Sequence, residues 1–155
     1  MNFHANAGSA MMQDTIYKSL QASRVQFIRV LWCDNANIIR GKAIHIGALS
    51  QLVDYGVGIC AAQQAIPVMH DAVVTESGLS PVGEIRLIPD WNTLSVLPYS
   101  TGHARAIGDM MQDGSPWAYC PRSFLKRAIA AAQQEGLEVM AAFENEFYLL
   151  HPADN

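Results

Sequence analysis

The chain has 155 residues, of which 50% are hydrophobic and 15% are charged. This balance is typical of a folded globular protein and excludes a disordered chain. The formal net charge is −4 and the charges of both signs are scattered, so we expect no nucleic-acid partner.

The cysteines and the start of the chain bear on where the protein works. Cys33, Cys60 and Cys120 are odd in number and widely spaced. Without a CxxC pair they indicate neither a zinc site nor a disulfide framework, and buried free thiols are expected. The first residues lack a basic region followed by an apolar core, and no apolar run approaches membrane-spanning length. These features predict a cytoplasmic protein without a membrane partner.

The first 118 residues have the pattern of a sheet-rich module with one helix across it. Residues 1–22 are expected to be frayed or to form a helical extension. A helix is expected at 46–55, where Leu49, Leu52 and Val53 share one apolar face and Gly56 ends it. The region 59–81 has the composition of a long surface excursion. Strands are expected where β-branched and aromatic residues gather between turns, at 25–32, 38–44, 84–88, 94–97 and 104–111.

The pattern changes at about residue 119. Pro121 occupies the position that proline prefers, the first turn of a helix, and the helical pattern continues over 122–134 to a cap at Gly136. Residues 137–150 are almost wholly apolar and rich in aromatic residues, which predicts a buried strand. This helix and strand are too short to close a core of their own.

Two carboxylates, Glu144 and Glu146, interrupt the predicted strand. Side chains alternate along a strand, so these two would point the same way with their backbones roughly 7 Å apart. Buried carboxylates need a cation, and a divalent metal would satisfy both. An ordinary strand with one face in water has the same pattern, and spacing alone leaves both interpretations open.

Several motifs resemble those of one family, the glutamine synthetases. Residues 86–93 resemble the family's "PD..T" signature, and residues 109–125 resemble its "G.P….PR..L" segment. Residues 144–147 resemble its "E.EF" metal-binding motif, and the predicted hairpin at 25–44 fits its opening strands. The motifs occur in the family's order and cover most of residues 25–150. The details resemble most the type I-like branch that includes the FluG and nodulin-type proteins.

The resemblance implies an α+β fold in which residues 1–118 form a β-grasp (ubiquitin-like) domain and residues 119–155 begin the catalytic domain. It implies that Glu144 and Glu146 each carry one of two divalent metals, Mg²⁺ or Mn²⁺. The implied reaction is phosphorylation of the glutamate γ-carboxylate by ATP, followed by attack of ammonia or an amine. It also implies a homo-oligomer. Catalytic residues and the ATP and glutamate sites are not assigned within these 155 residues, so the chain alone is expected to be inactive.

One segment departs from the family pattern. Typical members carry an "FDGSS" loop whose aspartate helps bind ammonium, whereas the nearest segment here, residues 58–63, has no aspartate. A larger amine is therefore favoured over ammonium, although Asp54 or Asp71 could supply the missing carboxylate. A second hypothesis also remains open, in which the chain is a non-catalytic β-grasp module used for assembly or regulation.

Overall fold

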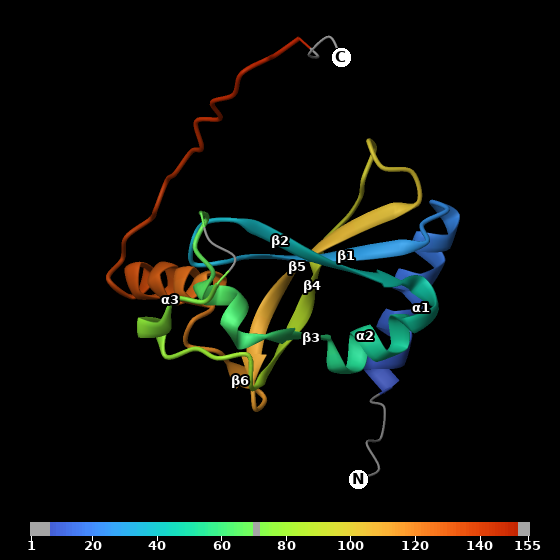
Figure 1. Cartoon of the computed structure of the whole chain (residues 1–155). Coiled ribbons are helices and arrows are strands. Elements are labelled where there is room, and N and C mark those ends of the chain that lie inside the picture. Colours follow the sequence, from blue (N-terminus) through green and yellow to red (C-terminus); the bar gives the residue numbers. More distant parts are fainter. Residues whose placement is uncertain (1–6, 70–71, 152–155) are drawn as a thin grey trace.

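The computed structural model describes residues 7–69 and 72–151, which form one mixed sheet and three α-helices (Figure 1). This confirms the expected α+β fold. Short 3₁₀ turns occupy Ile46–Ala48, Ala61–Ala65 and Thr75–Ser77. The helices and strands, in chain order, are α1 (Ala7–Ala22), β1 (Phe27–Cys33), β2 (Ile39–His45), α2 (Leu49–Tyr55), β3 (Val57–Cys60), β4 (Glu84–Val96), β5 (His103–Gln112), β6 (Ser115–Pro116) and α3 (Pro121–Gln134).

The sheet has the order β2-β1-β5-β4-β3, with β6 paired to β5. Strands β1 and β2 form an antiparallel hairpin, and β5 returns parallel to β1 at the centre of the sheet. The remaining pairs are antiparallel. A hairpin, a crossing helix and a parallel return strand are the arrangement expected of a β-grasp domain.

The core lies on one face of the sheet. Alternate residues of β1 (Ile28, Val30 and Trp32) are buried, as period-two alternation requires. Helices α1 and α2 cover this face together, through side chains such as Leu20 and Leu52, each at most 2% exposed. The predicted helical extension therefore contributes to the core, as a second helix beside α2.

Asp34 organises the turn of the first hairpin. Its buried carboxylate accepts hydrogen bonds from the backbone N–H groups of Ala36 and Ile38, both at 2.9 Å, and from Arg40 Nε at 2.6 Å. Asn37 has φ 63°, the left-handed conformation that asparagine tolerates. This turn closes the hairpin predicted at 25–44, and its buried charge is fully bonded.

The prediction of two separate strands at 84–88 and 94–97 was wrong. Residues 84–96 form a single strand, β4, that pairs with β5 at both ends. Between Asp90 and Ser95 the register shifts, so the extra residues form a bulge instead of reversing the chain. Asp90 and Asn92, residue types that favour turns, lie in this bulge.

The region 59–81 is more ordered at its start than predicted. Residues up to Cys60 continue β3, which pairs with β4, and the 3₁₀ turn Ala61–Ala65 follows. Gln64 in that turn is buried, with its amide nitrogen 2.7 Å from Met110 Sδ. Irregular backbone follows, and Asp71 lies outside the described residues.

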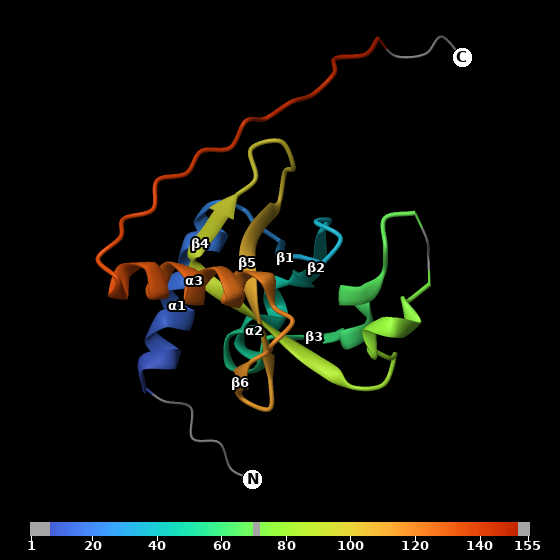
Figure 2. The same ribbon diagram turned by 90° about the vertical axis from the view of Figure 1, so that its left-hand side faces the viewer.

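The predicted strand at 137–150 is not formed. Gly136, at φ 72°, caps α3 as predicted, and residues 137–151 then run without regular secondary structure, away from the sheet in both views (Figures 1 and 2). A strand forms only when a neighbour takes its backbone hydrogen bonds, and the described part of the chain offers this segment none. Its aromatic residues are exposed, including Phe143 at 94% and Tyr148 at 93%. Across the described residues, none of the helices has the length and apolar character needed to cross a membrane.

Candidate functional site

Glu144 and Glu146 lie in the extended segment after α3, and both are exposed. Their side chains are not held on one face of a strand, so the geometric argument for a shared cation is not met here. Within residues 7–69 and 72–151, no three His, Cys, Asp or Glu side chains come together in a group able to hold a metal. The chain thus offers two carboxylates of suitable chemistry, without a third donor beside them.

A cluster of charged side chains joins α3 to the sheet. Arg122 donates from Nη2 to Asp90 Oδ2 at 2.6 Å and from Nη1 to Asp109 Oδ1 at 2.7 Å. One turn further along α3, Lys126 donates to Asp109 Oδ2 at 2.7 Å. The guanidinium therefore bridges two neighbouring strands, β4 and β5. We call these four residues, Asp90, Asp109, Arg122 and Lys126, the α3 clamp.

The bulge in β4 presents Asp90 to the clamp. Thr93 donates its hydroxyl to the Asp90 carbonyl at 2.6 Å and accepts from the Ile107 N–H at 2.8 Å. The Asn92 N–H also donates to Asp90 Oδ1 at 3.1 Å. The aspartate and threonine of the "PD..T" motif thus shape the same bulge, and the arginine of the "PR..L" motif binds it.

The contacts of the clamp shift the pKa values of Asp90 and Arg122. The hydrogen bond from Arg122 holds the pKa of Asp90 below its ordinary value of 3.8, with a further contribution from the Asn92 N–H, although partial burial opposes the shift. Burial alone would lower the pKa of Arg122, but its bonds to Asp90 and Asp109 outweigh that effect and raise it. Asp90 and Arg122 therefore form a charged pair near neutral pH.

The first turn of α3 is anchored differently. Cys120, 1% exposed, precedes the helix, and its Sγ accepts from the Ser123 N–H at 3.4 Å. The apolar face of this helix is largely uncovered, with Phe124 65%, Leu125 57% and Ile129 41% exposed. The start of α3 thus belongs to the core, while the rest is held mainly by polar bonds.

An apolar groove of about 520 Å³ lies between the outer face of the sheet and α3. Leu31 and Ile107 line it from the sheet, Leu125 from α3, and Phe143 from the segment beyond. Helix α3 therefore stands off the sheet beside the clamp instead of packing closely on it.

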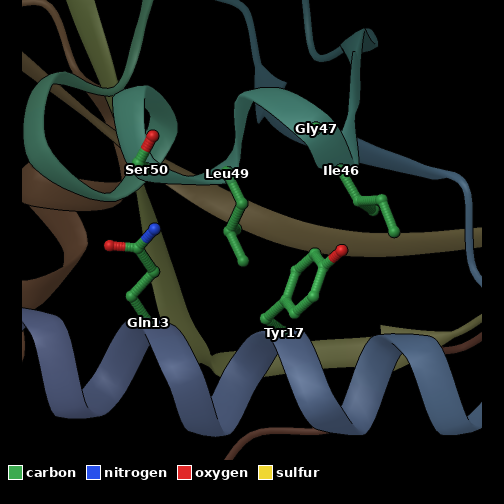
Figure 3. Close-up of a pocket in the computed structure, with 6 residues that line it drawn as sticks. All are labelled: Gln13, Tyr17, Ile46, Gly47, Leu49 and Ser50. Carbon is green, nitrogen blue, oxygen red and sulfur yellow. The ribbon is translucent and has the colours of Figure 1, made fainter.

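A smaller hollow of about 300 Å³ lies between α1 and the turn that leads into α2. Figure 3 shows Gln13 and Tyr17 pointing from α1 toward Ile46, Leu49 and Ser50. No acidic or basic side chain lines this hollow, so it has no group suited to a metal ion or a phosphate.

The sequence identified the motifs of the clamp without showing that they meet. Asp90 and Arg122 are 32 positions apart, and no local periodicity links them. Lys126 and Asp109 were not singled out at all. The sequence does contain one signal for this cluster. Arg122 and Lys126 are four positions apart on the predicted helix, so they share a face that can bind aspartates elsewhere in the chain.

The segment nearest the family's ammonium loop is apolar and built into the domain. Ile59 and Ala62 are buried, and no carboxylate lies at 58–63. Asp54 lies on α2.

Two family models match consecutive parts of the chain. The glutamine synthetase N-terminal domain matches residues 11–117, and the glutamine synthetase catalytic domain matches residues 118–155. The first of these matches covers most of the chain. The chain therefore belongs to the glutamine synthetase family.

Similar proteins carry several activities in their names. A type-1 glutamine synthetase of Dictyostelium discoideum is 34% identical over 85% of this chain and 29% of its own length. A gamma-glutamylanilide synthase of an Acinetobacter species is 25% identical over 91% of this chain and 31% of its own length. The gamma-glutamylputrescine synthetase PuuA of Escherichia coli is 33% identical over 92% of this chain and 31% of its own length. The chain spans about three tenths of the length of these relatives.

Solved structures share the fold. An apo structure of GmaS has a TM-score of 0.65 at 21% identity, covering 77% of this chain and 26% of its own. A glutamine synthase homolog has a TM-score of 0.63 at 24% identity, covering 72% of this chain and 27% of its own. At these identities the likeness shows the fold alone.

Proposed function

We propose that this chain forms the N-terminal part of an ATP-dependent ligase of the glutamine synthetase family. The enzyme would activate glutamate as γ-glutamyl phosphate and join it to ammonia or an amine. The observation that carries this proposal is the continuous match to both domains of the family, whose "PD..T" and "PR..L" motifs meet at the α3 clamp. Ligases of glutamate with amines among the named relatives support it further.

We propose that residues 1–118 are the β-grasp domain and that residues 119–155 begin the catalytic domain. The change of family model between residues 117 and 118 supports this division. So does the core, whose buried members all lie between Ile16 and Cys120. Glutamate, ATP and further copies of the chain would be the partners of the whole enzyme.

Glu144 and Glu146 are the proposed metal ligands, each for one of two Mg²⁺ or Mn²⁺ ions. The donor chemistry fits, because both ions prefer carboxylate oxygen. When bound, such ions neutralise the charge that gathers on a transferring phosphoryl group. Their place on an exposed segment means that these two residues supply only part of the coordination.

The nitrogen substrate is proposed to be an amine larger than ammonium. A site that selects ammonium needs a carboxylate to hold the small cation once water is removed. The segment at 58–63 supplies none, and its buried residues Ile59 and Ala62 support a less charged entrance. Steady-state rates of the full-length enzyme with ammonium and a panel of primary amines would test this. The proposal fails if ammonium gives the highest kcat/KM.

The ligase proposal is tested on the complete product of the gene that encodes this chain. ADP release would be measured with glutamate, ATP, Mg²⁺ and an amine, and the γ-glutamyl product identified by mass spectrometry. Glu144→Ala and Glu146→Ala should each abolish release. Glu138→Ala, in the same exposed segment, should not. Amine-dependent release that survives both of the first two changes would refute the metal assignment.

The alternative is a non-catalytic β-grasp module for assembly or regulation. It is favoured by one observation, that the sheet with α1 and α2 closes a core without residues 121–155. A gene whose product carries no nucleotide site and shows no amine-dependent ADP release would support it.

A further inference from the structure

Helix α3 is fixed to the domain at two places of different kinds. Its first turn is anchored in the core through Cys120, which is 1% exposed. Beyond that turn its apolar face is uncovered and a groove separates it from the sheet. A single anchor at one end leaves a helix free to swing, so other contacts must set its direction.

The α3 clamp supplies those contacts. Arg122 binds Asp90 on β4 and Asp109 on β5 at once, and Lys126 binds Asp109 from the next turn. The planar guanidinium donates in two fixed directions, so it restrains orientation as well as distance. The side chains of Arg122, Asp90 and Asp109 are 21–26% exposed, which protects their bonds from full solvent screening.

The direction of α3 determines where the following residues begin. A helix of 14 residues is about 21 Å long, so a swing of about 15° displaces its far end by roughly 5 Å. Glu144 and Glu146 lie ten and twelve positions after Gln134, the last residue of the helix. A swing of this size therefore moves the point from which the segment with these two residues starts.

We propose that Arg122 is a positioning residue, which sets the direction of α3 relative to the sheet and thereby the starting point of the segment that carries Glu144 and Glu146. The part that concerns metal binding rests on the proposed function. The part that concerns α3 does not.

The test measures the orientation of α3 directly in the 155-residue chain. Residual dipolar couplings of backbone amides would be recorded for the sheet and for α3 in the unchanged protein, Arg122→Met and Arg122→Lys. Arg127→Met is the matched control, because Arg127 lies on the same helix and contacts the Phe124 ring, 5.9 Å away, instead of the sheet. No metal or nucleotide is present, so the outcome is independent of the ligase proposal.

In Arg122→Met we expect couplings of α3 that no longer fit the alignment of the sheet, and amide exchange at 124–127 faster by about tenfold or more. The couplings of the sheet should keep their common alignment, and the melting temperature should fall only by the few degrees that loss of the clamp costs. Arg122→Lys should restore part of the alignment, because an ammonium can bind one strand but lacks the fork that bridges two. Arg127→Met should match the unchanged protein.

Two results would overturn the proposal. In the first, α3 of Arg122→Met keeps its alignment and amide protection. In the second, the sheet loses its common alignment together with α3, which would make Arg122 a general stabilising residue. If Arg122→Met does not fold, Asp90→Asn is measured instead, since it removes one side of the bridge at almost constant shape.

Discussion

Asp90 connects a local bulge to a contact between distant parts of the chain. Its carboxylate is charged because Arg122 stabilises the ionised form, which holds the pKa below 3.8. A carboxyl whose pKa is lower in the folded state than in the unfolded state stabilises the fold through its ionised form. Its contribution is present above the unfolded pKa and is lost as the pH falls through the folded pKa.

This predicts an acid-labile α3 clamp. The melting temperature of the unchanged protein should fall between about pH 5 and pH 2, as Asp90 takes up a proton and releases Arg122. Asp90→Asn should show a lower melting temperature at neutral pH and a shallower fall on the acid side. Scanning calorimetry across this range measures both.

Asp14→Asn is the control for this prediction. Asp14 is exposed and pairs with Lys18 within α1, where an ion pair contributes little. Parallel acid profiles for Asp90→Asn and the unchanged protein would contradict the role assigned to Asp90.

The α3 clamp shows that contacts between distant residues are difficult to predict from the sequence. The preference of proline for a first helical turn located Pro121 correctly, but Asp90 was expected between two short strands and lies in a bulge of one strand. The bond between Asp90 and Arg122 depends on a bulge that rotates one residue toward a helix 32 positions away. Such a contact depends on how the folded chain packs and not on the conformational preferences of neighbouring residues. The family motifs therefore identified these residues but did not show that they bind each other.

At the scale of single elements, the centre of the sheet depends on a glycine. A side chain at Gly108 in β5 would collide with the Leu87 side chain on β4 and lie 3.1 Å from Val30 Cγ1 on β1. Both neighbours are fully buried. Gly108→Ala should therefore reduce the free energy of unfolding by about 1–3 kcal/mol through overpacking.

Gly58→Ala provides the matched comparison. Gly58 lies on β3, and a side chain there would meet the end of Glu84, an exposed and flexible side chain that can move aside. We expect little change in stability. Urea denaturation of both variants measures the difference, and equal midpoints would show that the sheet adjusts around Gly108.

The extended segment after α3 shows the limit of pattern analysis for elements. Strands β1, β2 and β5 were located from β-branched and aromatic runs, and each has a partner strand. Residues 137–150 have a pattern at least as apolar, yet no described strand lies beside them. The apolar pattern shows that these residues favour burial in a sheet. A strand forms only if another strand pairs with the segment, and the pattern does not indicate whether one is present.

At the scale of the whole molecule, apolar surface is concentrated at one end. Phe124 and Leu125 on α3, and Met140, Phe147 and Leu149 beyond it, are 57–91% exposed. Surface of this kind drives association. We expect sedimentation velocity at micromolar concentration to show species larger than one chain, and Phe147→Ser with Leu149→Ser to shift the protein toward the monomer.

Val82→Ser serves as the control, because Val82 is 85% exposed in a distant loop. It should leave association unchanged. A monodisperse monomer for the unchanged protein at every concentration would rule out association through this surface.

The 155-residue chain should bind divalent metal weakly. Two exposed carboxylates without further donors cannot exclude water from an ion, so micromolar Mn²⁺ should raise the melting temperature by less than about 1 °C. A calorimetric titration with Mn²⁺ checks this, with the Glu144→Ala, Glu146→Ala double variant beside it. A large saturable rise that disappears in the double variant would show a more complete site.

The parallel pairing of β1 with β5 has a consequence for how fast the protein folds. Arg29 and His103, bonded at 3.2 Å across these central strands, are 74 positions apart. The β1–β2 hairpin can close early because its partners are near neighbours, but the sheet is complete only when a long loop has closed. We expect folding in milliseconds to seconds, the range of domains dominated by distant pairings. Until β5 pairs with β1, one edge of β1 is open to pairing with other chains. The risk of aggregation is therefore greatest before β5 has docked.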